Sequence, residues 1–151
     1  MSGGGAERVV LNFASLLHNS GYPVTLVLFE NKGPLTKFIP RLLPTYDLRR
    51  KKLRYSIIPL LFYIRKIKPK LIFSTFGYIN LVLLLISPFF PKHTKIWTRE
   101  ANLPSKSLKN NQFSWFMWYG YKYLYQYTDL LIVTSEKMKI EFQTIFNIKK
   151  N

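Results

Sequence analysis

Helix-like and strand-like stretches alternate along the whole chain, and this alternation restricts the fold more than any other feature of the sequence. Short apolar, β-branched runs predict strands, whereas apolar residues at helical spacing predict helices. The predicted strands are Val24–Phe29, Leu71–Ser74, Lys95–Thr98 and Leu130–Val133. The predicted helices are Glu7–Asn19, Leu53–Lys68, Tyr78–Ser87, Ser114–Tyr127 and Ser135–Phe146. Strands that are apolar on both faces occur in buried parallel sheets, so the sequence predicts an α/β fold with an open parallel sheet and helices on both faces.

Size and composition fit one globular domain. The chain has 151 residues, of which 48% are hydrophobic, and this excludes a disordered basic tail. It contains no cysteine, which excludes a disulfide framework, a thiolate metal site and a cysteine nucleophile. The apolar run Ile79–Phe90 is too short for a membrane span, and the opening MSGGGAER is unlike a signal peptide. We therefore expect a cytoplasmic protein.

A large excess of positive charge predicts an anionic partner. Lys and Arg number 23 against 7 Asp and Glu, which gives a formal charge of +16. Such a charge attracts nucleic acid, an anionic membrane leaflet or phosphorylated ligands. One dense basic run precedes the apolar stretch Ile57–Ile67, a pattern typical of a helix lying on an anionic membrane, although a solvated loop beside a core helix fits equally well. The membrane-facing candidates are Arg49, Arg50, Lys51, Lys52 and Arg54.

Three glycines open the first predicted helix. Gly3, Gly4 and Gly5 let the backbone turn tightly, and the helix that follows them offers its N-terminus to a phosphate. The pattern is neither a dinucleotide-binding fingerprint nor a P-loop, and a flexible leader before a helix explains it equally well. In this architecture such a turn normally follows a strand, so we expect that the first strand of the sheet is missing.

Polar residues follow two predicted strands, where ligands bind in open α/β sheets. Arg99, Glu100 and Asn102 come directly after one strand, and the Glu100 carboxylate is the candidate general base. The alternative for this cluster is a surface loop with an ion pair. Ser135 and Glu136 follow the last strand, where a helix N-cap is the favoured alternative to ligand binding.

The segment Phe113–Tyr127 is crowded with aromatic residues. They occupy every side of the predicted helix, so they cannot all face one core. Trp and Tyr favour membrane interfaces and also stack on single-stranded bases, while core plus ordinary surface aromatics is the third interpretation. His18 and His93 lack metal-ligand spacing, and no metal site is expected.

Four segments together resemble glycosyltransferase family 4. SGGGAERVVLNFASLLHNSGYPVTLVLF looks like the opening of its N-terminal domain, with a glycine loop and Glu-Arg before the first helix. IRKIKPKLIFSTFGYINLV resembles its helix-to-strand step, with Lys70 where Asp is usual. KIWTREANLP is similar to the strand that ends in a polar motif at the interdomain cleft. YTDLLIVTSEKMKIEF resembles the step into its last helix, with Thr128 in place of the usual Ala.

This resemblance implies a Rossmann-like domain over residues 1–151, the acceptor side of a two-domain enzyme. Such enzymes transfer a sugar from a nucleotide-sugar to an acceptor hydroxyl, here of a polysaccharide or lipid-linked glycan, without a metal or other cofactor. The resemblance places Gly4 and Gly5 at the cleft, with Arg99, Glu100 and Asn102 lining it from the strand end. We expect Gly3, Ser135 and Glu136 among the donor or acceptor contacts as well. It implies that a C-terminal donor domain is missing, that the chain alone is inactive, and that the protein is peripheral at the inner face of the membrane.

Two other functions remain open at the level of sequence. A basic, aromatic-rich nucleic-acid-binding module would use the net charge and the aromatic segment, and a non-catalytic membrane-surface scaffold would use the basic run. Nucleic-acid binders gather Lys and Arg on one face, whereas here they are spread through several loops. We therefore expect no nucleic-acid partner.

Overall fold

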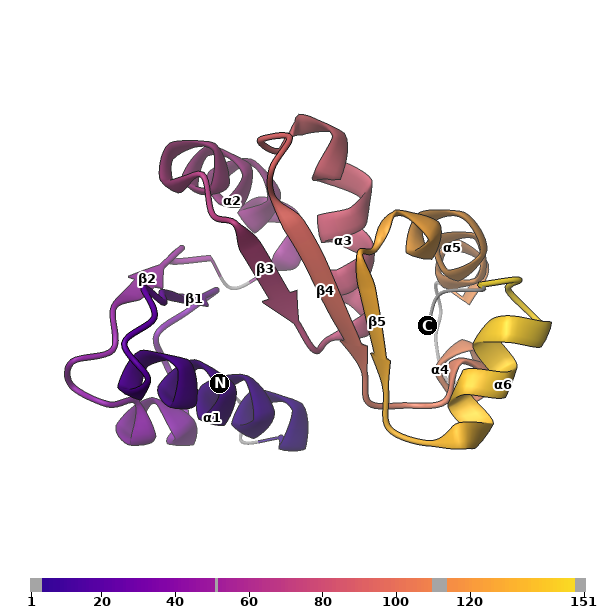
Figure 1. Cartoon of the computed structure of the whole chain (residues 1–151), viewed down its shortest axis with the longest axis horizontal. Helices are drawn as coiled ribbons and strands as arrows, with labels where there is room; N and C mark the ends of the chain where they lie inside the picture. The colour runs from indigo at the N-terminus through magenta and orange to yellow at the C-terminus, as the bar shows by residue number, and fades with distance from the viewer. Residues whose placement is uncertain (1–3, 51, 110–113, 149–151) are drawn as a thin grey trace. The chain divides into compact units, whose positions relative to one another are not determined.

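The computed structural model describes residues 4–50, 52–109 and 114–148. These residues form two compact units, Met1–Tyr63 and Ile64–Asn151. Each unit contains its own parallel sheet, and the strands of both can be followed in Figure 1. The predicted α/β class with parallel strands is thus confirmed, and the strands belong to two sheets.

The first unit contains a helix and a two-stranded sheet. Helix α1 (Gly5–Asn19) precedes strand β1 (Leu26–Leu28), the 3-10 turn η1 (Pro34–Phe38) and strand β2 (Thr45–Asp47). The two strands pair in parallel, with Leu26 opposite Thr45. A small core of α1, β1 and loop side chains holds the unit together through burial of apolar surface; its members are Leu11, Ala14, Leu26, Leu28 and Leu43.

Both ends of α1 follow from local sequence. Gly4 is the N-cap, and its backbone N–H donates to Glu7 Oε2 at 3.3 Å, half of a capping box. The carboxylate also lies at the positive end of the helix dipole. Gly21 ends the turn after the helix with φ +82°, a conformation that favours glycine.

Helix α2 (Leu53–Ile67) runs across the boundary between the two units. It buries Ser56, Leu60 and Ile64, which are spaced one helical turn apart. Pro59 lies within the helix, where it has no N–H to donate to the preceding turn.

The second unit contains a three-stranded parallel sheet in the order β3-β4-β5. Its strands are β3 (Leu71–Ser74), β4 (Lys95–Glu100) and β5 (Leu130–Val133). The central strand therefore continues two residues beyond the predicted end at Thr98. Its burial alternates, so that Ile96, Thr98 and Glu100 are buried.

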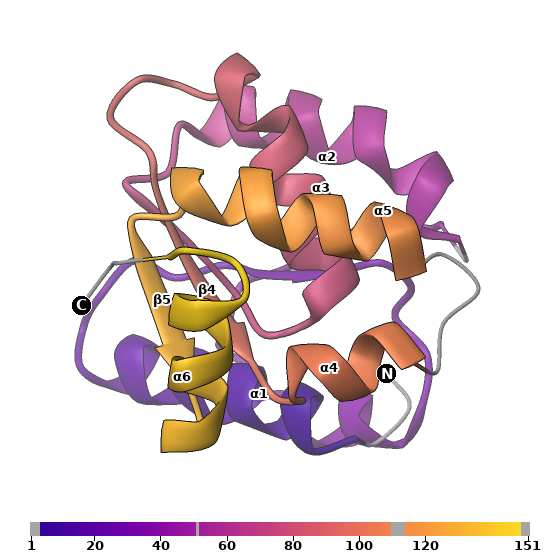
Figure 2. The same cartoon turned by 90° about the vertical axis from the view of Figure 1, so that its right-hand side faces the viewer.

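Helices accompany every strand of this sheet. They are α3 (Gly77–Ile86) with the 3-10 turn η2 (Ser87–Phe89), α4 (Pro104–Lys109), α5 (Ser114–Tyr119) and α6 (Glu136–Thr144). Figure 2 shows α5 running alongside α3. Within the described part of the chain, no helix is both long and apolar enough to span a bilayer.

The predicted helix Ser114–Tyr127 is present but changes type along its length. After α5 it continues as the π-helical segment η3 (Gly120–Leu124) and the 3-10 turn η4 (Tyr125–Tyr127). Gly120 sits where a Cβ atom would overlap the side chain of Leu81 on α3. The glycine therefore lets these two helical segments approach closely.

Candidate functional site

A buried polar cluster lies at the carboxyl end of β4 in the second unit. Its centre is Glu100, the last residue of the strand, which is only 3% exposed. The parallel pairing places it opposite Val133, the last residue of β5. Ligands bind at this end of open parallel sheets, which makes the cluster the candidate site.

Two side chains from distant parts of the sequence hold the Glu100 carboxyl group. Asn80 on α3 donates from Nδ2 to Glu100 Oε1 at 2.8 Å, and the hydroxyl of Tyr125 on η4 donates to the same oxygen. Asn80 Nδ2 also lies 3.1 Å from the backbone oxygen of Arg99. Both donors are fully buried, so the carboxyl group is held by groups that have little freedom to move.

Burial makes this carboxyl group titrate near neutral pH. Desolvation raises the pKa of Glu100 from 4.5 to about 7, although the hydrogen bonds from Tyr125 and Asn80 and the charge of Arg99 act in the opposite direction. The pKa of Tyr125 is raised well above its ordinary value by burial and by the Glu100 charge. The same two causes raise the pKa of Tyr121. Glu100 can therefore accept or release a proton at physiological pH, while both phenols stay protonated.

A glycine leaves room for the second carboxyl oxygen. Gly77 is the first residue of α3, and a Cβ atom there would lie 3.3 Å from Glu100 Oε2 and 3.4 Å from the Tyr121 hydroxyl. These separations are tighter than ordinary contacts, so a side chain would press on the carboxylate. Oε1 receives both hydrogen bonds described above, and both carboxyl oxygens border the Gly77 position, Oε2 at 3.3 Å and Oε1 at 3.4 Å from the Cβ atom that a side chain would add.

The neighbours of Glu100 in sequence do not share its environment. Arg99 is half-buried on the other side of the strand, as alternation along a strand requires, and Asn102 is exposed after the strand ends. The Glu100 carboxyl group takes its hydrogen bonds from Asn80 and Tyr125, so the alternative of a surface loop with an ion pair does not describe it.

At the end of β5, the N-cap interpretation is confirmed. Ser135 Oγ accepts a hydrogen bond from the backbone N–H of Met138 at 3.3 Å, at the start of α6. The exposed Glu136 side chain lies 3.4 Å from Lys139 Nζ. Ligand contacts by Ser135 and Glu136 stay a prediction.

The glycine turn belongs to the first unit. Gly4 and Gly5 are exposed, and a Cβ atom at either position would meet nothing within 4 Å. Gly3 lies outside the described residues. Glu100 belongs to the second unit, so a crevice shared by the glycines and the strand ends stays a prediction.

The basic run also belongs to the first unit. Arg49, Arg50, Lys52 and Arg54 are exposed, and Lys51 lies outside the described residues. Arg49 has φ +53°, and its backbone N–H donates to Asp47 Oδ1 at 2.8 Å. The turn at Asp47–Arg49 therefore connects the end of β2 to the basic run.

Sequence reasoning selected Glu100 but missed the groups that hold it. Tyr125 was one of many aromatics, and Gly77 had no distinguishing pattern. Asn80 carried a usable signal, because it is a polar residue inside the apolar run Ile79–Phe90. A buried amide needs a partner, and such a residue therefore points to a buried polar contact.

The fold and the strand-end cluster together define the chain as a Rossmann-like α/β domain with a buried carboxyl group at the carboxyl end of β4 in its second unit. The sequence model of Glycosyltransferase Family 4 matches residues 3–151. The chain therefore belongs to this family, as the resemblance of its four segments implied. No curated protein matches the chain.

Proposed function

We propose that this chain is the acceptor-side domain of a glycosyltransferase that moves a sugar from a nucleotide-sugar to a hydroxyl group of a glycan or lipid-linked acceptor. Membership of Glycosyltransferase Family 4 supports the reaction class. The observation that carries the proposal further is the Glu100 carboxyl group, whose pKa of about 7 suits proton transfer at the carboxyl end of a parallel sheet.

In this proposal Glu100 is the proton acceptor. As the acceptor oxygen forms its bond to the anomeric carbon, the hydroxyl proton passes to the carboxylate and the nucleoside diphosphate leaves with the electron pair of the broken bond. Asn80 and Tyr125 are positioning residues, because both hydrogen-bond Oε1 and so fix the orientation of the carboxyl group. The chain supplies no metal or other cofactor in this scheme.

The nucleotide-sugar is held mainly by a second domain in this proposal. Gly4 and Gly5 contribute backbone N–H groups at the start of α1, and Arg99, near the end of β4, and Asn102, beyond it, contribute side chains. A helix N-terminus favours phosphate, which supports the glycine turn as a contact for the diphosphate. The isolated chain is then expected to transfer no sugar.

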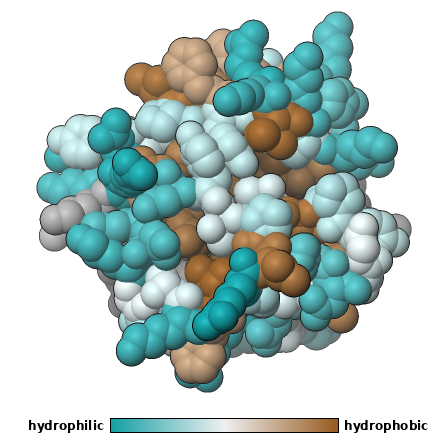
Figure 3. All heavy atoms as spheres, turned by 90° about the vertical axis from the view of Figure 1, so that its left-hand side faces the viewer, coloured by the Kyte–Doolittle hydropathy of each residue, from teal (hydrophilic) through white to brown (hydrophobic). Residues whose placement is uncertain are grey.

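A membrane location fits the acceptor and the surface of α2. Its exposed face carries Tyr55, Ile58 and Phe62, which are 57%, 66% and 70% exposed. Residues 48–99 contain no Asp or Glu, so the basic run and this apolar face lie in a stretch of uniformly positive charge. On the face drawn in Figure 3, apolar and hydrophilic side chains alternate over short distances. Basic residues beside an apolar helix face favour binding to anionic lipid, so we place the enzyme at the inner leaflet.

The acceptor role is tested with a short-chain, water-soluble prenyl diphosphate sugar, whose binding is monitored by saturation-transfer NMR. We expect magnetic saturation to pass from the protein to the sugar protons of the bound probe. The signal should be weaker in the Asn102→Ala variant, because Asn102 lies beyond the end of β4. A mixed-sequence oligonucleotide serves as the competing probe. Salt-sensitive binding of the oligonucleotide without any binding of the prenyl diphosphate sugar would contradict the proposal and favour a nucleic-acid-binding module.

The donor and membrane parts have separate tests. Radiolabelled nucleotide-sugars incubated with the chain and the prenyl probe should give no product, and turnover would show that no second domain is needed.

Cosedimentation with phosphatidylglycerol vesicles should weaken when Arg49→Ser and Arg50→Ser are combined. The matched control combines Lys37→Ser and Arg41→Ser, two exposed basic residues outside the run. If both double variants lose the same amount of vesicle binding, the loss reflects the lower net charge of the protein and the basic run has no special role.

A further inference from the structure

Four aromatic side chains form an exposed row along the helical segments α5, η3 and η4. They are spaced four residues apart, and each is at least half exposed: Trp115 65%, Tyr119 52%, Tyr123 51% and Tyr127 68%. We propose that this row, the aromatic row, binds an extended acidic glycan chain. The inference rests on the proposed function, because it names the acceptor class as a growing acidic glycan.

The aromatic row is separate from the core of the second unit. Tyr121 and Tyr125, from the same segments, are fully buried against Phe142 and near Glu100. Core packing therefore accounts for the aromatics between the members of the row but not for the row itself. Large exposed aromatics in a line are unusual on a surface that binds nothing.

The geometry of the helix aligns the two central members of the row. Four residues exceed one α-helical turn of 3.6 residues, so successive members of an α-helical row drift around the axis. The π-helical segment η3 holds more residues per turn and offsets this drift between Tyr119 and Tyr123, whereas the 3-10 turn η4 before Tyr127 holds fewer. The ring centroids of Tyr119 and Tyr123 lie 6.0 Å apart with planes within 12° of parallel, so the two rings face the same way. This spacing is comparable to the length of one sugar ring.

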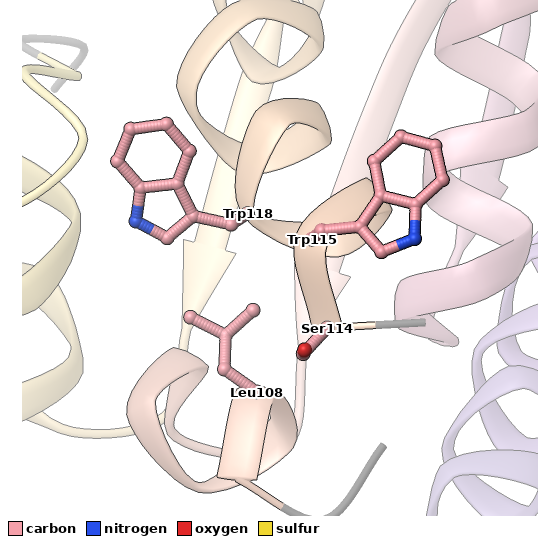
Figure 4. Close-up of a pocket in the computed structure, with 4 residues that line it drawn as sticks. All are labelled: Leu108, Ser114, Trp115 and Trp118. Carbon is pink, nitrogen blue, oxygen red and sulfur yellow. The ribbon is translucent and has the colours of Figure 1, made fainter. Parts of the chain in front are cut away.

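A hollow of about 330 Å³ lies at the Trp115 end of the row. It is lined by Leu108, Ser114, Trp115 and Trp118, and Figure 4 shows Leu108 on α4 pointing toward Trp118 on α5. A pocket with apolar walls and one hydroxyl suits a sugar ring, whose C–H face packs on an indole while its hydroxyl groups seek polar partners. The row thus begins at an open surface hollow with two indole rings among its lining residues.

The charge around the aromatic row favours an acidic chain. Residues 101–128 contain no Asp or Glu, and their described basic side chains include Lys106 and Lys122. Lys122 Nζ lies 4.9 Å from the ring centroid of Trp118 and 5.5 Å from that of Tyr123. A cation held over these rings can pair with a carboxylate of a glycan whose sugars pack on the neighbouring rings.

A glycan explains the row better than a lipid surface does. Trp and Tyr also occur at membrane interfaces, but there they flank aliphatic residues that enter the lipid, and residues 114–127 expose no large aliphatic side chain. Helices that enter the lipid boundary add aliphatic residues, as the exposed face of α2 does with Ile58. A sugar chain presents alternating apolar faces and hydroxyl rims, which match rings with polar tips.

The test compares natural protein with a variant that combines Tyr119→Ala and Tyr123→Ala. The matched control combines Tyr22→Ala and Phe38→Ala, which are 61% and 69% exposed in the first unit. Binding of an oligogalacturonate is followed by calorimetry and by tryptophan fluorescence, since Trp115 and Trp118 line the hollow. We expect the row variant to bind about tenfold more weakly and the control to bind like the natural protein.

Several results would overturn the inference. They are absence of oligogalacturonate binding, equal binding by natural protein and row variant, and a loss that appears only with anionic vesicles or with an oligothymidylate. A neutral dextran oligosaccharide bound as tightly as oligogalacturonate would remove the acidic part of the claim. The prenyl diphosphate sugar is also measured on the natural protein: if the natural protein binds this probe but does not bind oligogalacturonate, the inference about the aromatic row fails and the proposed function stands.

Discussion

Replacing Glu100 with glutamine removes a buried titratable group and keeps the size of the side chain. The free energy of unfolding depends on this group because its pKa is about 7 in the folded protein and 4.5 when exposed. The folded protein therefore holds the proton more tightly than the unfolded chain does. The extra stability that the folded state gains by holding this proton is fully present below about pH 4.5, falls as the pH rises, and is lost above about pH 7.

The magnitude follows from the two pKa values. The difference between 4.5 and about 7 corresponds to about 3 kcal/mol, at about 1.4 kcal/mol for each pH unit. The side chain is only 3% exposed, so solvent screens little of this effect. The Glu100→Gln variant carries no charge, and its Oε1 still accepts hydrogen bonds from Asn80 and Tyr125. We expect it to be more stable than the natural protein by up to about 3 kcal/mol at pH 8, and by only about 1 kcal/mol at pH 5.

Urea unfolding at pH 5, 6, 7 and 8 measures this difference directly. The Glu136→Gln variant is the control, because Glu136 is an exposed glutamate paired with Lys139, and its effect should be small at every pH. A stability difference between natural protein and Glu100→Gln that stays constant from pH 5 to pH 8 would refute the reasoning. So would a variant that is less stable than natural protein at pH 8.

Two further substitutions test the packing around the site. Gly120→Ala places a methyl group onto Leu81 and should cost about 1–3 kcal/mol of unfolding free energy by urea titration, whereas Gly5→Ala, in open space, should cost little. A Gly120→Ala variant as stable as natural protein would show that the two helical segments are not in close contact. Tyr125→Phe removes a hydrogen bond that lowers the pKa of Glu100, so an NMR titration should find that pKa raised further, and an unchanged value would contradict the assigned contact.

The fold was predictable where burial leaves a pattern in the sequence. Strands β1, β3, β4 and β5 are short apolar runs, and each was predicted near its observed position. Strand β2 was missed, because Thr45 and Tyr46 are exposed and Pro40 and Pro44 precede it. Only its backbone pairing with β1 makes it a strand, and pairing leaves no mark on side-chain polarity.

The candidate site was predictable only in part. Glu100 was predicted because it follows a predicted strand in the sequence, and this inference needs no information about packing. Its partners Asn80 and Tyr125 lie 20 and 25 residues away in sequence, so tertiary packing alone brings them together. The same packing divides the aromatic segment into the buried Tyr121 and Tyr125 and the exposed aromatic row.

The most direct test of the account is a ¹³C NMR titration of the Glu100 carboxyl group, assigned by comparison with Glu100→Gln, with and without the prenyl diphosphate sugar. We expect a pKa of about 7 for the free protein and a displaced titration when the acceptor probe is bound. A pKa near 4.5, or a titration that saturating probe leaves unchanged, would contradict the role of Glu100 as the proton acceptor of a glycosyltransferase.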